Sequence, residues 1–280
     1  MSEGEAAPAA EQGSRNLVMR VIAAAVLAPA AIAIAYAGGW LWTALVTFAA
    51  IGLYVEWLMI IGQARQTGVV ASGAAALALA GFWLAVGRID AALIVLSVGL
   101  AAVVLLSPGR RAWVAAGLLY AGAAEIASVL VRQDRAEGFV GLMLILLVVW
   151  VTDIGGYFAG RGIGGPKLWP RVSPKKTWAG AIGGLGASLV IAAGFVALGL
   201  GKAIQILVLA AMLSVTSQLG DLLESAVKRR FGVKDSSQII PGHGGLLDRL
   251  DGFVLAVVLG ATIGFLRGSL DGVGRGLMVW

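Results

Sequence analysis

Residues 138–158 read GFVGLMLILLVVWVTDIGGYF, an apolar run with one charged side chain, Asp153. A helix rises 1.5 Å per residue, so about 20 apolar residues cross the roughly 30 Å hydrocarbon layer of a bilayer. Hydrophobic residues make up 59% of the 280-residue chain and charged residues only 13%, whereas soluble domains carry roughly 25% charged residues. The composition therefore predicts an all-α polytopic integral membrane protein and excludes a soluble or disordered chain.

Similar apolar runs recur along the sequence and predict about nine membrane spans. The third and fourth runs are separated only by Gly87 and Arg88, so eight spans is the alternative. The polar start predicts a disordered tail over 1–16, followed by N-terminal membrane helices over 17–137 and a membrane region richer in polar residues over 138–270. The expected spans are 17–37, 40–61, 69–87, 89–106, 112–131, 138–158, 178–200, 203–227 and 252–268.

The basic residues predict an orientation. With nine spans and the N-terminus inside, most of the 21 Lys and Arg residues lie on the inner side, as the positive-inside rule favours. The two long polar loops, 159–177 and 228–251, are then cytoplasmic, and a bacterial chain would lie in the inner membrane. The net charge of +6 is interpreted as loop charge facing anionic lipid rather than as affinity for nucleic acid. The absence of cysteine excludes thiolate chemistry and disulfides.

A polar stripe runs along the predicted span 203–227. Its members recur at helical spacing and are Ser214, Gln218, Asp221, Ser225 and Lys228. Such a stripe on a membrane helix has to face protein or water rather than lipid. A helix that enters at Ala203 reaches the opposite surface about 20 residues later, so Asp221 and Ser225 are expected at the height of the phospholipid headgroups.

The loop 228–251 reads KRRFGVKDSSQIIPGHGGLLDRLD and interleaves five basic residues with three acids. Its proline and glycines predict a tight turn with exposed backbone N–H groups, which suits anions. Carboxylates beside phosphates are the usual setting for Mg²⁺, so Asp221 and Asp248, on separate helices, are predicted to hold the ion; a second cation is left open. The loop residues expected at the site are Lys228, Arg229, Lys234, Asp235, His243, Gly244, Gly245, Arg249 and Asp251.

The loop 159–177 reads AGRGIGGPKLWPRVSPKKT and carries five cations and no acid, which predicts an anion-binding surface. Ser173, Lys175 and Lys176 are its expected substrate contacts, and Asp153 adds an acid at the same height.

Three other features, two acids and a pair of glycines, are weaker signals of function. Two isolated acids within spans, Glu56 and Glu125, are interpreted as packing or neutral groups and are assigned no role in a site. The spacing of Gly180 and Gly184 favours close helix packing.

Three segments carry a resemblance to a known family. SAVKR at 225–229, KD at 234–235 and PGHGGLLDRLD at 241–251 together resemble the signature of the phosphatidate cytidylyltransferases, the CDP-diacylglycerol synthases. GDLLES at 220–225, and the upstream segments around 153–161 and 173–177, are also similar to that family. The resemblance covers about residues 150–252. It departs at Ala179, where the family usually has Glu, so any role of that acid is absent here or supplied elsewhere.

The resemblance implies a nucleotidyl transfer in phospholipid biosynthesis: CTP and phosphatidate give CDP-diacylglycerol and pyrophosphate with Mg²⁺. It implies metal roles for Asp221 and Asp248. The residues expected to act in catalysis are Asp221, Asp248, Lys228, Arg229 and Ser225. The fold expected around them has a polar cavity open to the cytoplasmic side and the membrane, where the lipid substrate lies.

Three alternatives stay open at this stage. A related membrane enzyme could act on another lipid phosphate or on a polyprenol. The buried acids could instead serve a cation-coupled transporter, although no internal repeat is present. A structural scaffold would not need several acids and many cations at one depth. A homodimer is left open.

Overall fold

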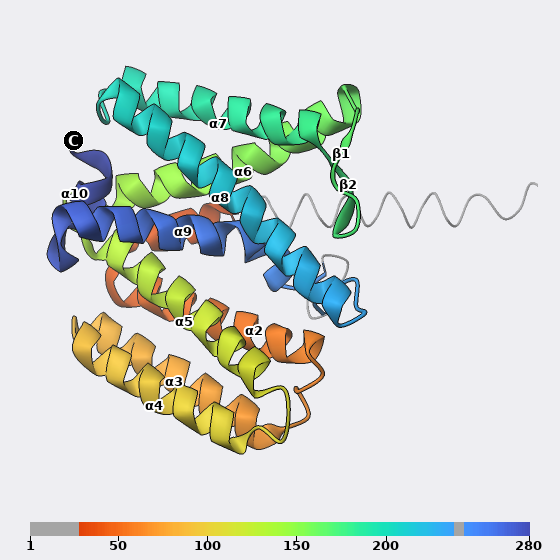
Figure 1. Ribbon diagram of the computed structural model, residues 1–280. Coiled ribbons are helices and arrows are strands. Elements are labelled where there is room, and N and C mark those ends of the chain that lie inside the picture. The colour runs from red at the N-terminus through yellow and green to blue at the C-terminus, as the bar shows by residue number, and fades with distance from the viewer. Residues whose placement is uncertain (1–27, 238–243) are drawn as a thin grey trace, which may run out of the picture.

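The computed structural model describes residues 28–237 and 244–280. Within these ranges, eight apolar helices are long enough to cross a membrane, which confirms an all-α polytopic membrane protein (Figure 1). They are α2 (Gly39–Ile60), α3 (Thr67–Ala85), α4 (Ile89–Leu106), α5 (Arg111–Gln133), α6 (Gly138–Gly162), α7 (Trp178–Ala197), α8 (Ala203–Arg230) and α9 (Leu247–Gly268).

The start of the chain is described only in part. The predicted tail 1–16 and residues 17–27 of the first predicted span lie outside the described residues. The remainder of that span forms the helix Ala28–Ala37.

The third and fourth predicted spans form two separate helices, and because residues 17–27 of the first predicted span lie outside the described residues, the total of eight or nine spans stays a prediction. α3 ends at Ala85 and α4 begins at Ile89, and Gly87 between them has a φ of 76°. This left-handed conformation stops a helix and is readily adopted by glycine. Arg88 pairs with Asp90 in the first turn of α4, with Nη2 and Oδ2 2.8 Å apart. A negative charge at a helix N-terminus is stabilising.

Two predicted boundaries, the end of α6 and the start of α9, differ from the structure more than the others do. α9 begins at Leu247 rather than at 252, because side-chain carboxylates accept the N–H groups around its first turn. α6 continues to Gly162, and the predicted loop 159–177 contains a two-stranded antiparallel hairpin of β1 (Lys167–Trp169) and β2 (Ser173–Thr177). At the C-terminus the 3₁₀ turn η1 (Leu270–Gly272) and α10 (Val273–Met278) follow α9.

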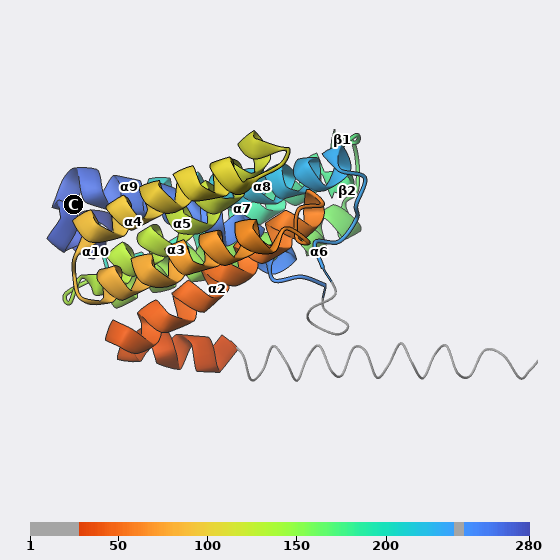
Figure 2. The same cartoon turned by 90° about the horizontal axis from the view of Figure 1, so that it is seen from below.

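The long helices alternate in direction, so one end of the bundle gathers the polar segments. We call this the site end: it comprises the β1–β2 hairpin, the end of α8, the start of α9 and the α2–α3 and α4–α5 connections. Figures 1 and 2, seen from directions 90° apart, both show these segments together on the right.

Glycines bring α6 and α7 into close contact, as the spacing of Gly180 and Gly184 predicts. A Cβ atom on Gly184 would lie 2.6 Å from the carbonyl oxygen of Thr152, and one on Gly180 would lie 2.9 Å from that of Gly156. Both distances are too short for a side chain, so these positions allow the backbones to approach.

A second close approach joins α8 to α9. A Cβ atom on Gly220 would lie 2.4 Å from the carbonyl oxygen of Asp251, and one on Gly252 would lie 3.1 Å from that of Ser217. Asp221 follows Gly220 on α8, and Asp251 precedes Gly252 on α9. The close contact of the two backbones therefore brings these two acids near each other.

Candidate functional site

The polar stripe of α8 faces other helices, as predicted. The hydroxyl of Thr152 on α6 donates to Ser214 Oγ at 2.9 Å, and Gln218 Nε2 donates to the carbonyl oxygen of Ala181 on α7 at 3.3 Å. The stripe therefore fixes α8 against α6 and α7 before it reaches Asp221. This arrangement satisfies polar groups that lipid could not.

Asp221 lies at the centre of a first group of charges. Lys176 on β2 forms an ion pair with its Oδ2 atom, and Ser225 Oγ donates to its Oδ1 atom at 3.4 Å. The carboxyl groups of Asp153, Asp221 and Asp251 also interact electrostatically with one another and with Lys176. The hairpin thus brings one ammonium group to three acids that come from α6, α8 and α9.

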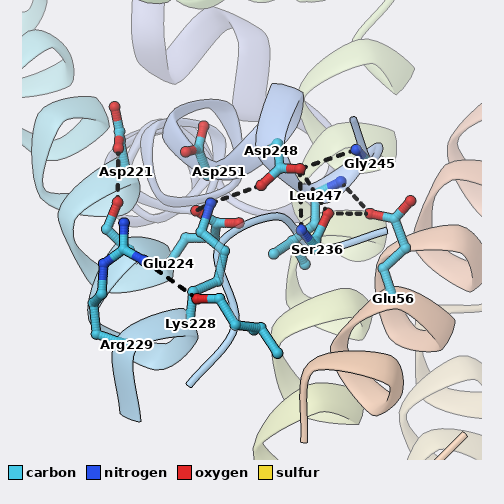
Figure 3. Close-up of polar contacts among 12 residues, drawn as sticks. Glu56, Asp221, Glu224, Lys228, Arg229, Ser236, Gly245, Leu247, Asp248 and Asp251 are labelled. Carbon is cyan, nitrogen blue, oxygen red and sulfur yellow. Dashed lines mark hydrogen bonds and ion pairs between the residues drawn. The ribbon is translucent and has the colours of Figure 1, made fainter. Parts of the chain in front are cut away.

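Lys228 forms the second group. Its Nζ atom lies 2.6 Å from Glu224 Oε2 and 2.6 Å from Asp248 Oδ1. The three side chains are between 3% and 16% exposed, so the contacts are shielded from water. Two carboxylates share one ammonium, and this arrangement leaves an excess of negative charge for a further cation or proton. Figure 3 shows Lys228, Glu224 and Asp248 close to Asp251 and Asp221.

Asp248 has further donors around it. Its Oδ2 atom accepts hydrogen bonds from the backbone N–H of Gly245 at 2.9 Å, the backbone N–H of Ser236 at 3.2 Å and the hydroxyl of Ser236 at 3.0 Å. Gly244 has a φ of 77°, which glycine adopts at little cost. Asp248 therefore ties the segment after α8 to the first turn of α9, in the manner of a helix cap.

Glu56, to which the sequence assigns no role, lies close to Asp248 in the structure because Ser236 Oγ is within hydrogen-bonding distance of both. It lies on α2, is 1% exposed, and accepts hydrogen bonds from Ser236, Ser237, Leu246 and Leu247. An acid inside an apolar span is a visible signal in the sequence. Its partners, however, lie 180 or more residues away, and nothing local indicates them.

The remaining predicted residues fall into three sets. Ser173 is half-buried at the start of β2, and Gly245 is buried beside Asp248. The exposed residues at the site end are Lys175, Arg229, Lys234, Asp235 and Arg249. His243 lies outside the described residues.

An apolar groove of about 730 Å³ adjoins the charged groups. Helices α2, α5, α8 and α9 supply its walls. Its lining includes Trp113, Tyr120, Leu223 and Val254, and Arg230 lines it as well. The hydroxyl of Tyr120 donates to the carbonyl oxygen of Asp251 at 3.4 Å. A single side chain thus connects the apolar wall to the acid cluster.

The fold and the site together define a polytopic membrane protein with lysine–carboxylate pairs gathered at one end of its helices. The chain belongs to the cytidylyltransferase family, whose sequence model matches residues 18–266. It is therefore a nucleotidyltransferase. The family match extends well beyond the segment 150–252 on which the resemblance rested, and it includes α2 and α5.

Two relatives of this chain are phosphatidate cytidylyltransferases. It is 40% identical to the phosphatidate cytidylyltransferase of Brucella suis biovar 1 over 256 residues, which cover 87% of this chain and 92% of that protein. It is 46% identical to the phosphatidate cytidylyltransferase of Staphylococcus saprophyticus over 130 residues, 45% of this chain and 50% of the relative. The matches confirm the resemblance that the motifs indicate.

Proposed function

We propose that this chain is a phosphatidate cytidylyltransferase, which converts CTP and phosphatidate to CDP-diacylglycerol and pyrophosphate. The observation that carries the proposal is the pairing of Lys176 with Asp221 and of Lys228 with Asp248 at one end of the bundle. A triphosphate and a lipid phosphate need cations for neutralisation and carboxylates for a metal ion. Both groups are present beside an apolar groove that suits acyl chains.

The proposed reaction forms one bond and breaks one. An oxygen of the phosphatidate phosphate attacks the α-phosphorus of CTP, and the bond from that phosphorus to the oxygen bridging to the β-phosphate breaks. The electron pair leaves with pyrophosphate. Because the lipid phosphate is already anionic, no side chain has to remove a proton, and positioning with charge neutralisation supplies most of the catalysis.

Each group of residues has a proposed task. Lys176 and Lys228, with the exposed Lys175, Arg229, Lys234 and Arg249, neutralise phosphate oxygens. Ser225 donates a hydrogen bond beside Asp221. The backbone N–H groups around Gly244 and Gly245 bind anions, and Asp235, Asp251 and Asp153 orient the cations.

Asp221 and Asp248 are the proposed ligands of Mg²⁺. No three acids within 28–237 and 244–280 converge as a ready metal site, but Mg²⁺ is usually held by one or two carboxylates together with substrate phosphates. Each of the two acids already contacts an ammonium group, so their oxygens suit a cation. When bound, Mg²⁺ would neutralise phosphate charge on the leaving group.

A labelled-nucleotide assay tests the activity. Purified protein in detergent–lipid micelles receives phosphatidate, CTP labelled at the α-phosphate, and Mg²⁺. The proposal expects label in the lipid phase that requires phosphatidate and disappears with EDTA. Label transferred to another lipid phosphate or to a polyprenol, but not to phosphatidate, would replace the proposed substrate.

We also propose that the site end faces the cytoplasm, in the inner membrane of a bacterial cell. The concentration of basic residues at this end supports the orientation. The chain has no cysteine, so single cysteines at Arg65 and Arg88 can report the two ends. A maleimide that does not cross membranes should label the cysteine at 88 in intact cells, and the one at 65 only after lysis. The reverse pattern would overturn the orientation.

A further inference from the structure

Glu56 joins the first half of the chain to the segment that precedes α9. Its Oε1 atom accepts from the backbone N–H of Leu246 at 2.8 Å and from Ser237 Oγ at 2.7 Å. Its Oε2 atom accepts from the backbone N–H of Leu247 at 2.7 Å and from Ser236 Oγ at 2.9 Å. All four donors are neutral, and within the described residues no cation forms an ion pair with Glu56.

The hydrogen bonds of Glu56 explain how its carboxylate can be buried. A buried ionised carboxylate is costly unless hydrogen bonds replace its water, and four donors are a nearly complete replacement. Two of the donors are backbone groups at the start of α9, where the helix dipole also favours a negative charge. Glu56 therefore holds the start of α9 together with the two serines that precede it in the chain.

Glu56 and Asp248 divide the donors of this segment between them. The N–H of Gly245 goes to Asp248, and those of the next two residues go to Glu56. Ser236 Oγ lies within hydrogen-bonding distance of both carboxylates, and its single proton serves one or the other. Figure 3 shows Ser236 between Asp248 and Glu56.

The space between the two acids has no room for another side chain. A Cβ atom on Gly245 would lie 1.8 Å from Ser236 Oγ and 2.4 Å from Glu56 Oε2. Glycine at this position is therefore required for the two carboxylates to share one segment.

We propose that Glu56 is a positioning residue of the reaction site: by holding Ser236 and the first residues of α9, it holds the carboxylate of Asp248 against Lys228. The role rests on the proposed function, since Asp248 and Lys228 are its proposed catalytic groups. It also assigns a part in the site to α2, which lies outside the segment where the signature residues occur.

The test compares Glu56→Gln with Glu125→Gln in the full-length protein. Glu125 is an equally buried acid on α5 that accepts a hydrogen bond from Thr47 Oγ1 at 2.7 Å, and within the described part of the chain no hydrogen bond joins it to Ser236, Leu246 or Leu247. Three quantities are measured: amide hydrogen exchange in a peptide that contains Leu246 and Leu247, kcat, and KM for CTP.

In Glu56→Gln, an NH₂ group replaces one carboxylate oxygen. This group is itself a donor, so it cannot accept the hydrogen bonds that reached that oxygen. Exchange at Leu246 and Leu247 should become at least tenfold faster, and kcat should fall at least 30-fold with less than a threefold change in KM. Glu125→Gln should leave both exchange and kcat within twofold of wild type. A general loss of packing would not produce this difference between two matched substitutions.

Ser237→Ala covers the case in which Glu56→Gln does not fold. It removes one donor to Glu56, and it should lower kcat three- to tenfold and speed exchange at Leu246. Unchanged exchange or unchanged kcat in a folded variant, or an equal loss in Glu125→Gln, would overturn the positioning role. A wild-type protein that transfers no label would overturn the proposed function, and the exchange data would still decide whether Glu56 holds the segment.

Discussion

Lys228 and Asp248 stand 20 residues apart in the chain and on different helices, yet Lys228 Nζ lies 2.6 Å from Asp248 Oδ1. The contact connects the end of α8 to the first turn of α9. Glu224, one turn before Lys228, contacts the same ammonium group. Lys228 thus both holds α8 against α9 and neutralises part of the negative charge of Glu224 and Asp248.

Replacing Lys228 should therefore damage both folding and activity. In Lys228→Met, Glu224 and Asp248 lose their shared cation while staying buried, and loss of one partner of a buried ion pair costs about 3 kcal/mol. We expect a clear drop in the melting temperature in detergent and at least a 100-fold loss of label transfer. Arg65→Gln, an exposed cation at the same end, should change neither. A Lys228→Met protein with normal turnover would remove Lys228 from the site.

The variant Asp248→Asn tests the role of the negative charge of Asp248 with little change in side-chain size. Asparagine is nearly the same size and keeps an oxygen that can accept from Gly245 and Ser236, so the protein should fold and insert. The negative charge opposite Lys228 is lost, and we expect turnover to fall by orders of magnitude. Gel filtration and thermal unfolding check the fold, and the lipid-label assay checks turnover. Turnover like that of the wild type would exclude Asp248 as a metal ligand.

Replacing Asp221 should change the Mg²⁺ concentration that label transfer requires. EDTA should abolish label transfer by the wild-type protein, and added Mg²⁺ should restore it. Asp221→Asn removes one charged ligand, so half-maximal activity should require at least tenfold more Mg²⁺. Titration of the metal at saturating CTP measures this shift. An unchanged midpoint with reduced kcat would assign Asp221 to orienting Lys176 rather than to the metal.

Two neighbouring glycines of α7 should respond differently to alanine. A Cβ atom at Gly184 would meet the backbone of Thr152 at 2.6 Å, whereas one at Gly186 meets nothing within 4 Å. Overpacking costs roughly 1–3 kcal/mol, while alanine in place of an unpacked helical glycine is favourable. Gly184→Ala should lower the melting temperature, and Gly186→Ala should keep or raise it. Equal effects of the two would contradict the close contact of α6 with α7.

Asp134, between α5 and α6, should contribute stability that depends on pH. Burial tends to raise the pKa of Asp134, but hydrogen bonds from the backbone N–H groups of Arg275, Ala136 and Glu137, with the charge of Arg275, hold that pKa below 3.8. An acid with a lowered pKa in the folded state stabilises the fold above its unfolded pKa and loses this effect as the pH falls.

The melting temperature should consequently decline as the pH drops from about 5 to below 3.8, near the ordinary pKa of aspartate. Asp134→Asn should melt a few degrees lower than wild type at pH 7 and show a flatter profile over this range. Thermal unfolding across the pH series measures both effects. Profiles of equal slope would mean that another acid dominates.

Much of the fold could be predicted from the sequence because each span has to satisfy its own backbone in lipid. Long apolar runs therefore predict helices one at a time, and the Gly87–Arg88 break between α3 and α4 is visible locally. The sequence predicts the start of α9 five residues too late, because the carboxylates that cap this helix come partly from α2. The sequence does not predict the β1–β2 hairpin, because its strands are short and polar and show no clear hydrophobic periodicity.

The sequence by itself determined the membrane class, the helical spans and the motif residues, Asp221, Lys228 and Asp248 among them. These depend on composition and on spacing along one helix. Only the tertiary structure decided which charges meet. Lys176 reaches Asp221 because a hairpin crosses to α8, and Glu56 reaches the start of α9 because α2 packs beside it. Hydrogen bonds and ion pairs act over a few ångströms of space, and residues 180 positions apart become neighbours only when the helices pack.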